Sequence, residues 1–191
     1  MARLSCFSTD DFLKSAASLI ADGGPETATT AAILRHAGAS AGSFYYRFAS
    51  RDQLLGELWL GLVEGYQRAF LDLLHAGDWR SAALFTPRWT RSHPIESRIL
   101  LLYSKNDFVS EKWPATFVAR ANRNAEELKA GLQAFVERHW GECTEKTMRR
   151  AQFALIDMPL AAVRRHLAAH EQVPQWIDDM VQECCEVLIS R

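Results

Sequence analysis

Apolar side chains recur at helical spacing along almost the whole chain, and this pattern restricts the fold more than any other feature. The longest example has its repeating positions at Leu54, Leu58, Leu62, Tyr66, Phe70 and Leu74. Because one helical turn takes 3.6 residues, side chains four residues apart lie on one side of an α-helix. No run of alternating β-branched residues bounded by turn dipeptides indicates a strand. The sequence therefore predicts an all-α protein.

Glycines, prolines and capping residues divide this pattern into about nine or ten helices. The predicted helices span residues 8–22, 29–37, 40–48, 50–77, 79–93, 95–104, 115–140, 144–169 and 174–191. We expect Pro87 to break or kink the fifth helix, because proline has no backbone N–H. Residues 105–114 are interpreted as a loop. A chain of 191 residues, of which 48% are hydrophobic, can hold one sizeable core or a small domain joined to a larger one.

Residues 29–48 predict two short helices separated by Gly38, which is the arrangement of a helix-turn-helix. Phe44 and Phe48 share one face of the second helix and are expected to be buried. The opposite face then presents Ser40, Ala41, Ser43, Tyr45, Tyr46 and Arg47. Such a face can enter a DNA major groove and donate hydrogen bonds to phosphates and bases. A tightly packed helical hairpin with surface tyrosines is the alternative for this segment taken alone.

The order of residues around this segment resembles the DNA-binding domain of the tetracycline-repressor (TetR) family. The matching positions are Gly24, Thr29, Ile33, Ala37-Gly38, Ser40-Ala41-Gly42-Ser43-Phe44-Tyr45, Phe48 and Arg51-Asp52-Gln53-Leu54. The resemblance implies a three-helix DNA-binding domain at residues 6–66, with its motif at about 29–48. It further implies that the long helix after Ser50 joins this domain to a larger helical domain, residues 67–191, for effector binding and dimerisation.

The resemblance also implies roles for individual residues. Thr29 and Tyr45 would bind phosphates, and Arg51 would do so from the start of the long helix, where the helix dipole favours anions. The residues that would face bases or the DNA backbone are Ser40, Ala41, Gly42, Ser43 and Tyr46, with Arg47 beside them. This chain departs from the family at Ala41, where a basic residue is common, and at Ala31 and Ala32, where polar contacts are common.

Charge gives little support for strong nonspecific DNA binding. The whole chain has 22 Lys and Arg against 23 Asp and Glu, a formal net charge of −1. Residues 1–56 hold five cations (Arg3, Lys14, Arg35, Arg47 and Arg51) and five acids (Asp10, Asp11, Asp22, Glu26 and Asp52). Nonspecific affinity comes mainly from phosphate neutralisation, so we expect modest nonspecific binding and a shallow salt dependence.

The larger C-terminal part is rich in aromatic side chains. Our candidates for an effector pocket are Phe85, Trp89, Tyr103, Phe108, Trp113, Phe117 and Asn122. Ordinary core packing is the alternative for each aromatic residue separately, but as a set, in a family that binds small effectors, some are expected to border a cavity. The effector would then be an apolar or aromatic small molecule.

The last two predicted helices carry apolar stripes, and the resemblance implies that they form the interface of a homodimer. The candidate interface residues are Met148, Leu155, Met158, Ile177, Val181, Cys184 and Leu188. A two-fold dimer would place two recognition helices one DNA turn apart, about 34 Å, and would require a palindromic operator.

Other classes of protein have little support. The sequence has no nucleotide-binding glycine loop, no His-Glu-x-x-His and no nucleophile elbow, so we predict no enzyme, no cofactor and no metal site. No apolar stretch approaches the roughly 20 residues of a membrane span, and we expect a cytoplasmic protein. The sequence therefore predicts a one-component transcription regulator, a repressor released from double-stranded DNA by a small molecule. The alternative is an all-helical small-molecule binding protein with a weakened DNA-binding head.

Overall fold

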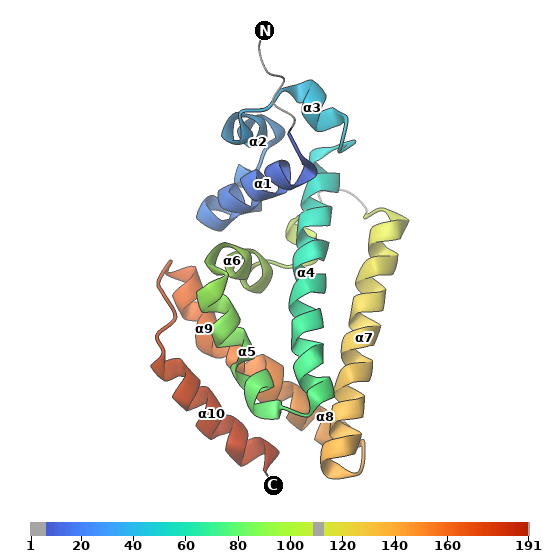
Figure 1. Cartoon of the computed structure of the whole chain (residues 1–191), viewed down its shortest axis with the longest axis vertical. Coiled ribbons are helices and arrows are strands. Elements are labelled where there is room, and N and C mark those ends of the chain that lie inside the picture. Colours follow the sequence, from blue (N-terminus) through green and yellow to red (C-terminus); the bar gives the residue numbers. More distant parts are fainter. Residues whose placement is uncertain (1–6, 109–112, 191) are drawn as a thin grey trace.

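The computed structural model describes residues 7–108 and 113–190, and these ranges contain helices and no strand (Figure 1). The α-helices are α1 (Thr9–Gly23), α2 (Thr30–Ala37), α3 (Ala41–Tyr45), α4 (Arg51–Ala76), α5 (Trp79–Ser92), α6 (Pro94–Leu102), α7 (Ala115–Trp140), α8 (Glu145–Gln152), α9 (Met158–Ala168) and α10 (Trp176–Ile189). Two 3-10 helices, η1 (Pro25–Thr27) and η2 (Lys105–Asp107), and one π-helix, η3 (Phe153–Asp157), complete them. The predicted all-α class is confirmed.

Helices α1, α2 and α3 form a small head at one end of the molecule, on the first turns of α4 (Figure 1). Its core is aromatic: the Phe44 ring packs 5.6 Å from both the Phe12 and the Phe48 ring centroids. Two residues from later in the chain, Ile99 and Phe108, complete this core and are fully buried. The head is therefore packed against the rest of the chain and does not hang from α4 alone.

The 26-residue helix α4 runs from the head to the far end of the molecule, and α7 lies beside it in the same direction (Figure 1). Glycines bring the two helices together at two levels. A Cβ atom added to Gly56 would lie 2.3 Å from the Phe117 ring, and one added to Gly131 would lie 2.3 Å from Leu71. Side chains on one helix thus pack directly on the backbone of the other.

The remaining helices form the body, whose buried core draws on α4, α5, α7, α8, η3, α9 and α10. Helix α5 lies inside the body, where it contacts α4, α6, α9, α10 and η3. No helix in the described ranges is long and apolar enough to cross a membrane.

The structure differs from three local predictions. Helix α5 continues through Pro87 to Ser92. Pro87 is buried, and burial of α5 against its neighbours outweighs the one hydrogen bond that proline removes. The predicted single helix 144–169 is interrupted by η3, whose wider turn precedes Pro159 at the start of α9. Residues 105–107 form η2 rather than loop, and the expected loop at 109–112 lies outside the described residues.

Candidate DNA-binding surface and effector cavity

The turn between α2 and α3 is built from local capping contacts. The Thr29 hydroxyl accepts a hydrogen bond from the Ala32 N–H at 3.2 Å and starts α2. Gly38 ends α2 in the left-handed conformation, with φ 67°, which favours glycine. The Ser40 hydroxyl then accepts from the Ser43 N–H at 3.2 Å and starts α3. Each cap satisfies a backbone N–H that the helix leaves unpaired.

Helix α3 has one buried and one exposed side. Phe44 is completely buried, whereas the exposed fractions of Tyr45 and Tyr46 are 58% and 85%. A Cβ atom added to Gly42 would meet no other atom of the chain within 4 Å. The outward side of α3 is therefore open to a partner, and it lies at the end of the molecule (Figure 1).

The two arginines near α3 are both held by other groups. An Arg47 Nη1–H donates to the Ser43 carbonyl at 2.9 Å, and its guanidinium lies 5.6 Å from the centre of the Tyr46 ring. Arg51 donates to the carbonyl of Ala28 at 2.8 Å and to that of Pro25 at 2.6 Å. Arg51 thus ties the start of α4 to the segment before α2, a structural role that the sequence did not indicate.

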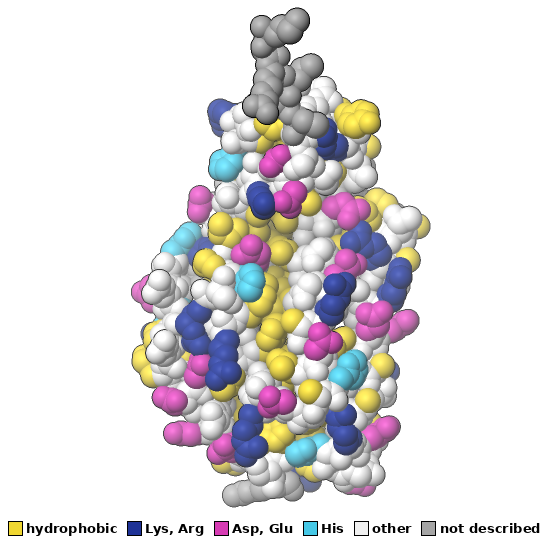
Figure 2. Space-filling view, in the orientation of Figure 1, with side chains coloured by type: hydrophobic (Ala, Val, Ile, Leu, Met, Phe, Trp, Pro, Cys, Tyr) yellow, Lys and Arg dark blue, Asp and Glu magenta, His cyan; other side chains and the backbone are white. Residues whose placement is uncertain are grey.

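The face of the molecule seen in Figure 2 carries charges of both signs, interspersed over α4 and α7, and a strip of apolar side chains beside α4. This surface has no large region of one sign. The mixture agrees with the nearly neutral composition of the chain and gives no basic surface for nucleic acid on this face.

An apolar cavity of about 280 Å³ lies between α4, α6, α7 and η3. It is lined by Trp59, Val63, Tyr66, Gln67, Phe70, Leu100, Leu101, Leu128 and Ile156. The Tyr66 hydroxyl is 2.7 Å from the Thr86 hydroxyl, and burial raises the pKa of Tyr66 to about 12, so the phenol stays neutral. The π-helix η3 contributes Ile156, and π-helical turns occur frequently at functional sites.

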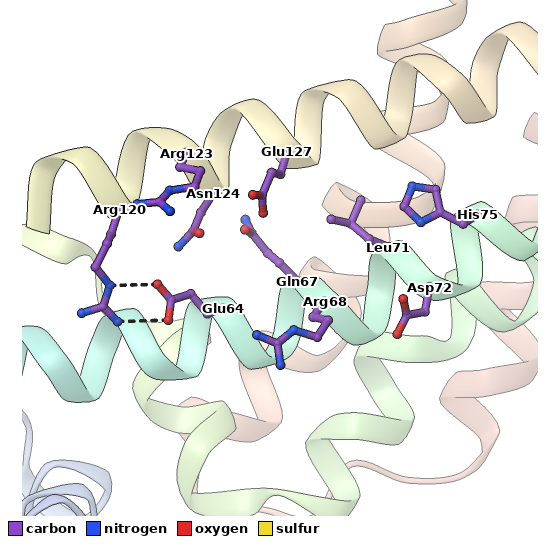
Figure 3. Close-up of a pocket in the computed structure, with 10 residues that line it drawn as sticks. All are labelled: Glu64, Gln67, Arg68, Leu71, Asp72, His75, Arg120, Arg123, Asn124 and Glu127. Atoms are coloured by element: carbon purple, nitrogen blue, oxygen red, sulfur yellow. Dashed lines mark hydrogen bonds and ion pairs between the residues drawn. The ribbon is translucent and has the colours of Figure 1, made fainter.

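A polar groove of about 450 Å³ lies on the outer side of α4 and α7 (Figure 3). Arg120 binds Glu64 through two hydrogen bonds of 3.0 Å and Glu57 through one of 2.6 Å. These bonds from Arg120 hold the pKa of Glu64 below its usual value, and the two carboxylates raise the pKa of Arg120. Gln67 lines both this groove and the apolar cavity.

The predicted pocket residues do not come together in one site. Phe85 and Trp89 line a separate groove of about 590 Å³ between α4 and α5. Phe108 is fully buried in the core of the head, with Tyr103 and Trp113 packed against that core. The remaining two, Phe117 and Asn122, lie on α7, where Phe117 is buried and Asn122 is exposed. The lining of the apolar cavity was missed because its residues belong to helical stripes that also build ordinary core; a polar Gln67 within such a stripe was the available signal.

Three predicted dimer residues point into the chain's own core. The exposed fractions are 0% for Leu155, 4% for Ile177 and 1% for Val181, so a partner cannot reach them. Met148, Met158 and Leu188 are half-buried against the same core, and Cys184 is exposed. The large apolar side chains exposed nearby are Phe153, Trp176, Met180 and Val187. Within the described ranges, no group of three or more His, Cys, Asp or Glu side chains could hold a metal ion.

Comparisons with known proteins agree with the architecture. Residues 12–58 match the family model for the tetR family of bacterial regulatory proteins. A protein from Shewanella sp. PV-4, described as a tetR family transcription regulator, aligns over 95% of both chains with a TM-score of 0.64 and 19% identity. The transcriptional regulator FadR from Bacillus subtilis, crystallised in complex with stearoyl-CoA, aligns over 96% of this chain and 98% of its own, with a TM-score of 0.63 and 12% identity. No curated protein matches.

A capped helix-turn-helix with an open recognition helix, carried by an all-helical body, is the fold of a DNA-binding transcription regulator. Residues 12–58 match the model of the tetR family of bacterial regulatory proteins, which confirms the resemblance inferred from the sequence. The likeness to the two solved structures extends the same fold over the whole chain.

Proposed function

We propose that the chain is a one-component repressor that binds a palindromic operator as a homodimer and leaves it when a small apolar molecule binds the body. The observation that carries this proposal is the outward side of α3, where Tyr45 and Tyr46 are exposed above a buried Phe44. In this proposal Ser40, Ala41, Gly42, Ser43 and Tyr46 face the groove, Thr29 and Tyr45 bind phosphates, and Arg47 contributes its charge. Arg51 acts on DNA indirectly, by holding the head on α4.

The exposed apolar side of α10 supports a dimer through the last helices. Trp176, Met180, Cys184 and Val187 follow one another at intervals of four, four and three residues and are all exposed. This exposed stripe lies next to the buried stripe of the same helix. The proposed interface therefore uses α10, as the sequence predicts, but through the exposed stripe. Burying such a surface against a second copy is favourable, because exposed apolar patches of this kind mark association sites.

The apolar cavity supports effector binding in the body. Its volume of about 280 Å³ is just below the range of about 300–1,000 Å³ typical of ligand pockets, which favours a small compact ligand. Trp59 Nε1, on a side chain that lines the cavity, is buried and has no hydrogen-bond partner. The structural neighbour crystallised with stearoyl-CoA supports a ligand with an apolar part, but a chain of that length would need the cavity to enlarge.

Helix α4 connects the cavity to the head. Trp59, Val63 and Phe70 line the cavity, and the same helix begins at Arg51, which is bonded to the head. A ligand that separates α4 from α7 would tilt α4 and change the distance between the two recognition helices of a dimer. Operator affinity would then fall, because both helices must fit one side of the duplex.

Glycine 42 allows a sharp test of the DNA-binding surface. Gly42→Ala adds a Cβ atom that meets nothing in the chain, so the fold should be kept and α3 slightly stabilised. The same atom would stand between α3 and the DNA. After selection of bound duplexes from a random library, we expect Gly42→Ala and Tyr46→Ala each to weaken binding at least about tenfold, with Ile95→Ala on the body as an exposed apolar control.

The second candidate function, a small-molecule binding protein with a weakened head, is favoured by the zero net charge of residues 1–56. It predicts that no duplex is selected and that both head variants behave as wild type. The repressor predicts selective binding with a log–log salt slope shallower than about −8 for the dimer, because so few cations lie near the motif. Met180→Glu should separate the dimer without unfolding the chain, since Met180 is 54% exposed.

A further inference from the structure

Three helices that are far apart in the sequence meet at the Arg98 side chain. Arg98 lies on α6, and its Nε–H donates to the Ala21 carbonyl at the end of α1, at 2.6 Å. In a continuing helix, the Ala21 carbonyl would accept from the N–H four residues later. That residue is Pro25, which has no N–H. Arg98 therefore satisfies a carbonyl of the head that lacks the N–H donor of a continuing helix.

The rest of the Arg98 guanidinium binds the end of α9 in the body. It donates to the Leu167 carbonyl and, at 2.5 Å, to His170 Nε2. His170 ends this helix in the left-handed conformation, with φ 57°, which is uncommon for any residue other than glycine. One cation thus lies at the C-terminal ends of α1 and α9, where the helix dipoles place partial negative charge.

We propose that Arg98 is a positioning residue that holds the DNA-binding head at a fixed orientation on the body, together with His170. The proposal concerns how the proposed DNA-binding function is regulated and rests on it only for the operator experiment below. A guanidinium can donate in three directions within one plane. This matches the three acceptors here, which are one carbonyl on each of two helices and one imidazole nitrogen. A lysine at this position offers one ammonium group and cannot span them.

His170 supplies the third acceptor of this contact. A guanidinium has no acceptor, so His170 Nε2 accepts from Arg98 through its lone pair. A cavity of about 400 Å³ lies beside this contact. The other charged groups that line it are Arg91 from α5 and Glu171. The Glu171 carboxylate lies 3.4 Å from His166 Nδ1, and Arg91 is bound by Asp178. The acceptors of Arg98 are thus two backbone carbonyls and one imidazole nitrogen.

Hydrogen exchange of the backbone amides of residues 20–24 tests the contact without DNA or effector. For Arg98→Ala, we expect exchange at the end of α1 to rise about tenfold, the effect of losing a charge-assisted hydrogen bond. Arg138→Ala is the matched control, because Arg138 also donates to two helix-end carbonyls, those of Leu74 and His75, but at the far end of α4. It should leave the amides of residues 20–24 unchanged. Equal effects of the two variants, or no effect of Arg98→Ala, would overturn the proposal.

Two further variants separate positioning from simple packing. His170→Gly keeps the left-handed backbone and removes the imidazole, so exchange of residues 20–24 should rise about threefold as one acceptor of Arg98 is lost. Arg98→Lys should resemble Arg98→Ala. Unchanged exchange in His170→Gly, or full rescue by Arg98→Lys, would contradict the assignment.

The operator experiment measures orientation. With the duplex selected for the wild type, shifting the half-site spacing by one base pair should weaken wild-type binding more than Arg98→Ala binding, because a loosely held head tolerates both spacings. Equal spacing selectivity in the two proteins would overturn the role of Arg98 in positioning. If no duplex is selected for the wild type, the proposed function fails, while the exchange experiments still decide whether Arg98 holds the head.

Discussion

The head and the body differ in how far neighbouring residues determine their structure. In the head, Ser8, Thr29, Ser40 and Ser50 each accept a hydrogen bond from the N–H three residues later, so every helix start is visible in the sequence. In the body, Asp78 and Thr144 cap α5 and α8, but α6, α7, α9 and α10 begin without a side-chain cap. Their positions depend on packing against residues far away in the chain. Contacts within a few residues can be inferred from sequence; the side on which a distant helix packs cannot.

The aromatic core of the head should show the largest effect of a single substitution. Phe44→Ala removes a fully buried ring that packs on Phe12 and Phe48. The free energy of unfolding of the head should fall by about 3–5 kcal/mol. Urea denaturation followed by circular dichroism and by tryptophan fluorescence, which reports mainly on the body, would measure both parts. Tyr46→Ala in the same helix should change stability by less than about 0.5 kcal/mol; similar losses for both variants would contradict the observed packing.

Helix α10 shows why the dimer residues were only partly predicted. The helix carries two adjacent apolar stripes, one through Ile177, Val181 and Cys185 and one through Trp176 and Met180. The first stripe is buried against the body and the second is exposed. Both have helical spacing and similar hydrophobicity, so the pattern alone does not indicate which one the rest of the chain covers.

The continuation of α5 through Pro87 and the π-helix η3 have the same cause. Each breaks a local rule, and each is compensated by burial against several other helices. The fold class, most helices and the two sides of α3 could be predicted because caps and periodicity are local. The cavity residues could not, because a cavity is defined by what does not fill the space between α4, α6, α7 and η3.

The close contact between Gly56 on α4 and Phe117 on α7 is visible only in the folded chain. Gly56→Ala places a Cβ atom 2.3 Å from the Phe117 ring, whereas Gly61→Ala on the same helix meets nothing within 4 Å. Overpacking should destabilise Gly56→Ala by about 1–3 kcal/mol, less the gain in helix propensity. Gly61→Ala should be neutral or stabilising by up to about 1 kcal/mol. Thermal unfolding of both variants measures the difference, and equal melting temperatures would show that α4 and α7 are not in close contact.

One helix cap in the head and one in the body should contribute the same amount to stability. Ser40→Ala and Thr144→Ala each remove a hydroxyl that accepts from the N–H three residues later, and each should cost about 1 kcal/mol. The two losses of stability should therefore be similar in chemical denaturation. Only Ser40→Ala should weaken binding to the selected duplex, because Ser40 caps the helix that faces DNA. A comparable loss of binding in Thr144→Ala would mean that general stability, and not the order of α3, governs DNA affinity.

The smallest effect concerns the ion pairs that cross from α7 to α4. Arg120 is 27% exposed and its partners Glu57 and Glu64 are 36% and 30% exposed, so solvent screening limits the contribution of these ion pairs to about 1 kcal/mol or less.

Arg120 lowers the pKa of Glu64 below its ordinary value of 4.5. A lowered pKa in the folded state contributes stability above the unfolded value and loses it as pH falls through the folded value. The stability difference between wild type and Arg120→Met should thus be fully present above the ordinary Glu pKa of 4.5 and be lost as pH falls through the lowered pKa of Glu64. Urea denaturation over this pH range measures it, with Arg68→Met, an arginine on α4 that lines the same groove, as the control. A difference that does not change with pH would mean that Arg120 acts through its packing on Phe117, so that α4 and α7 are joined by close packing alone.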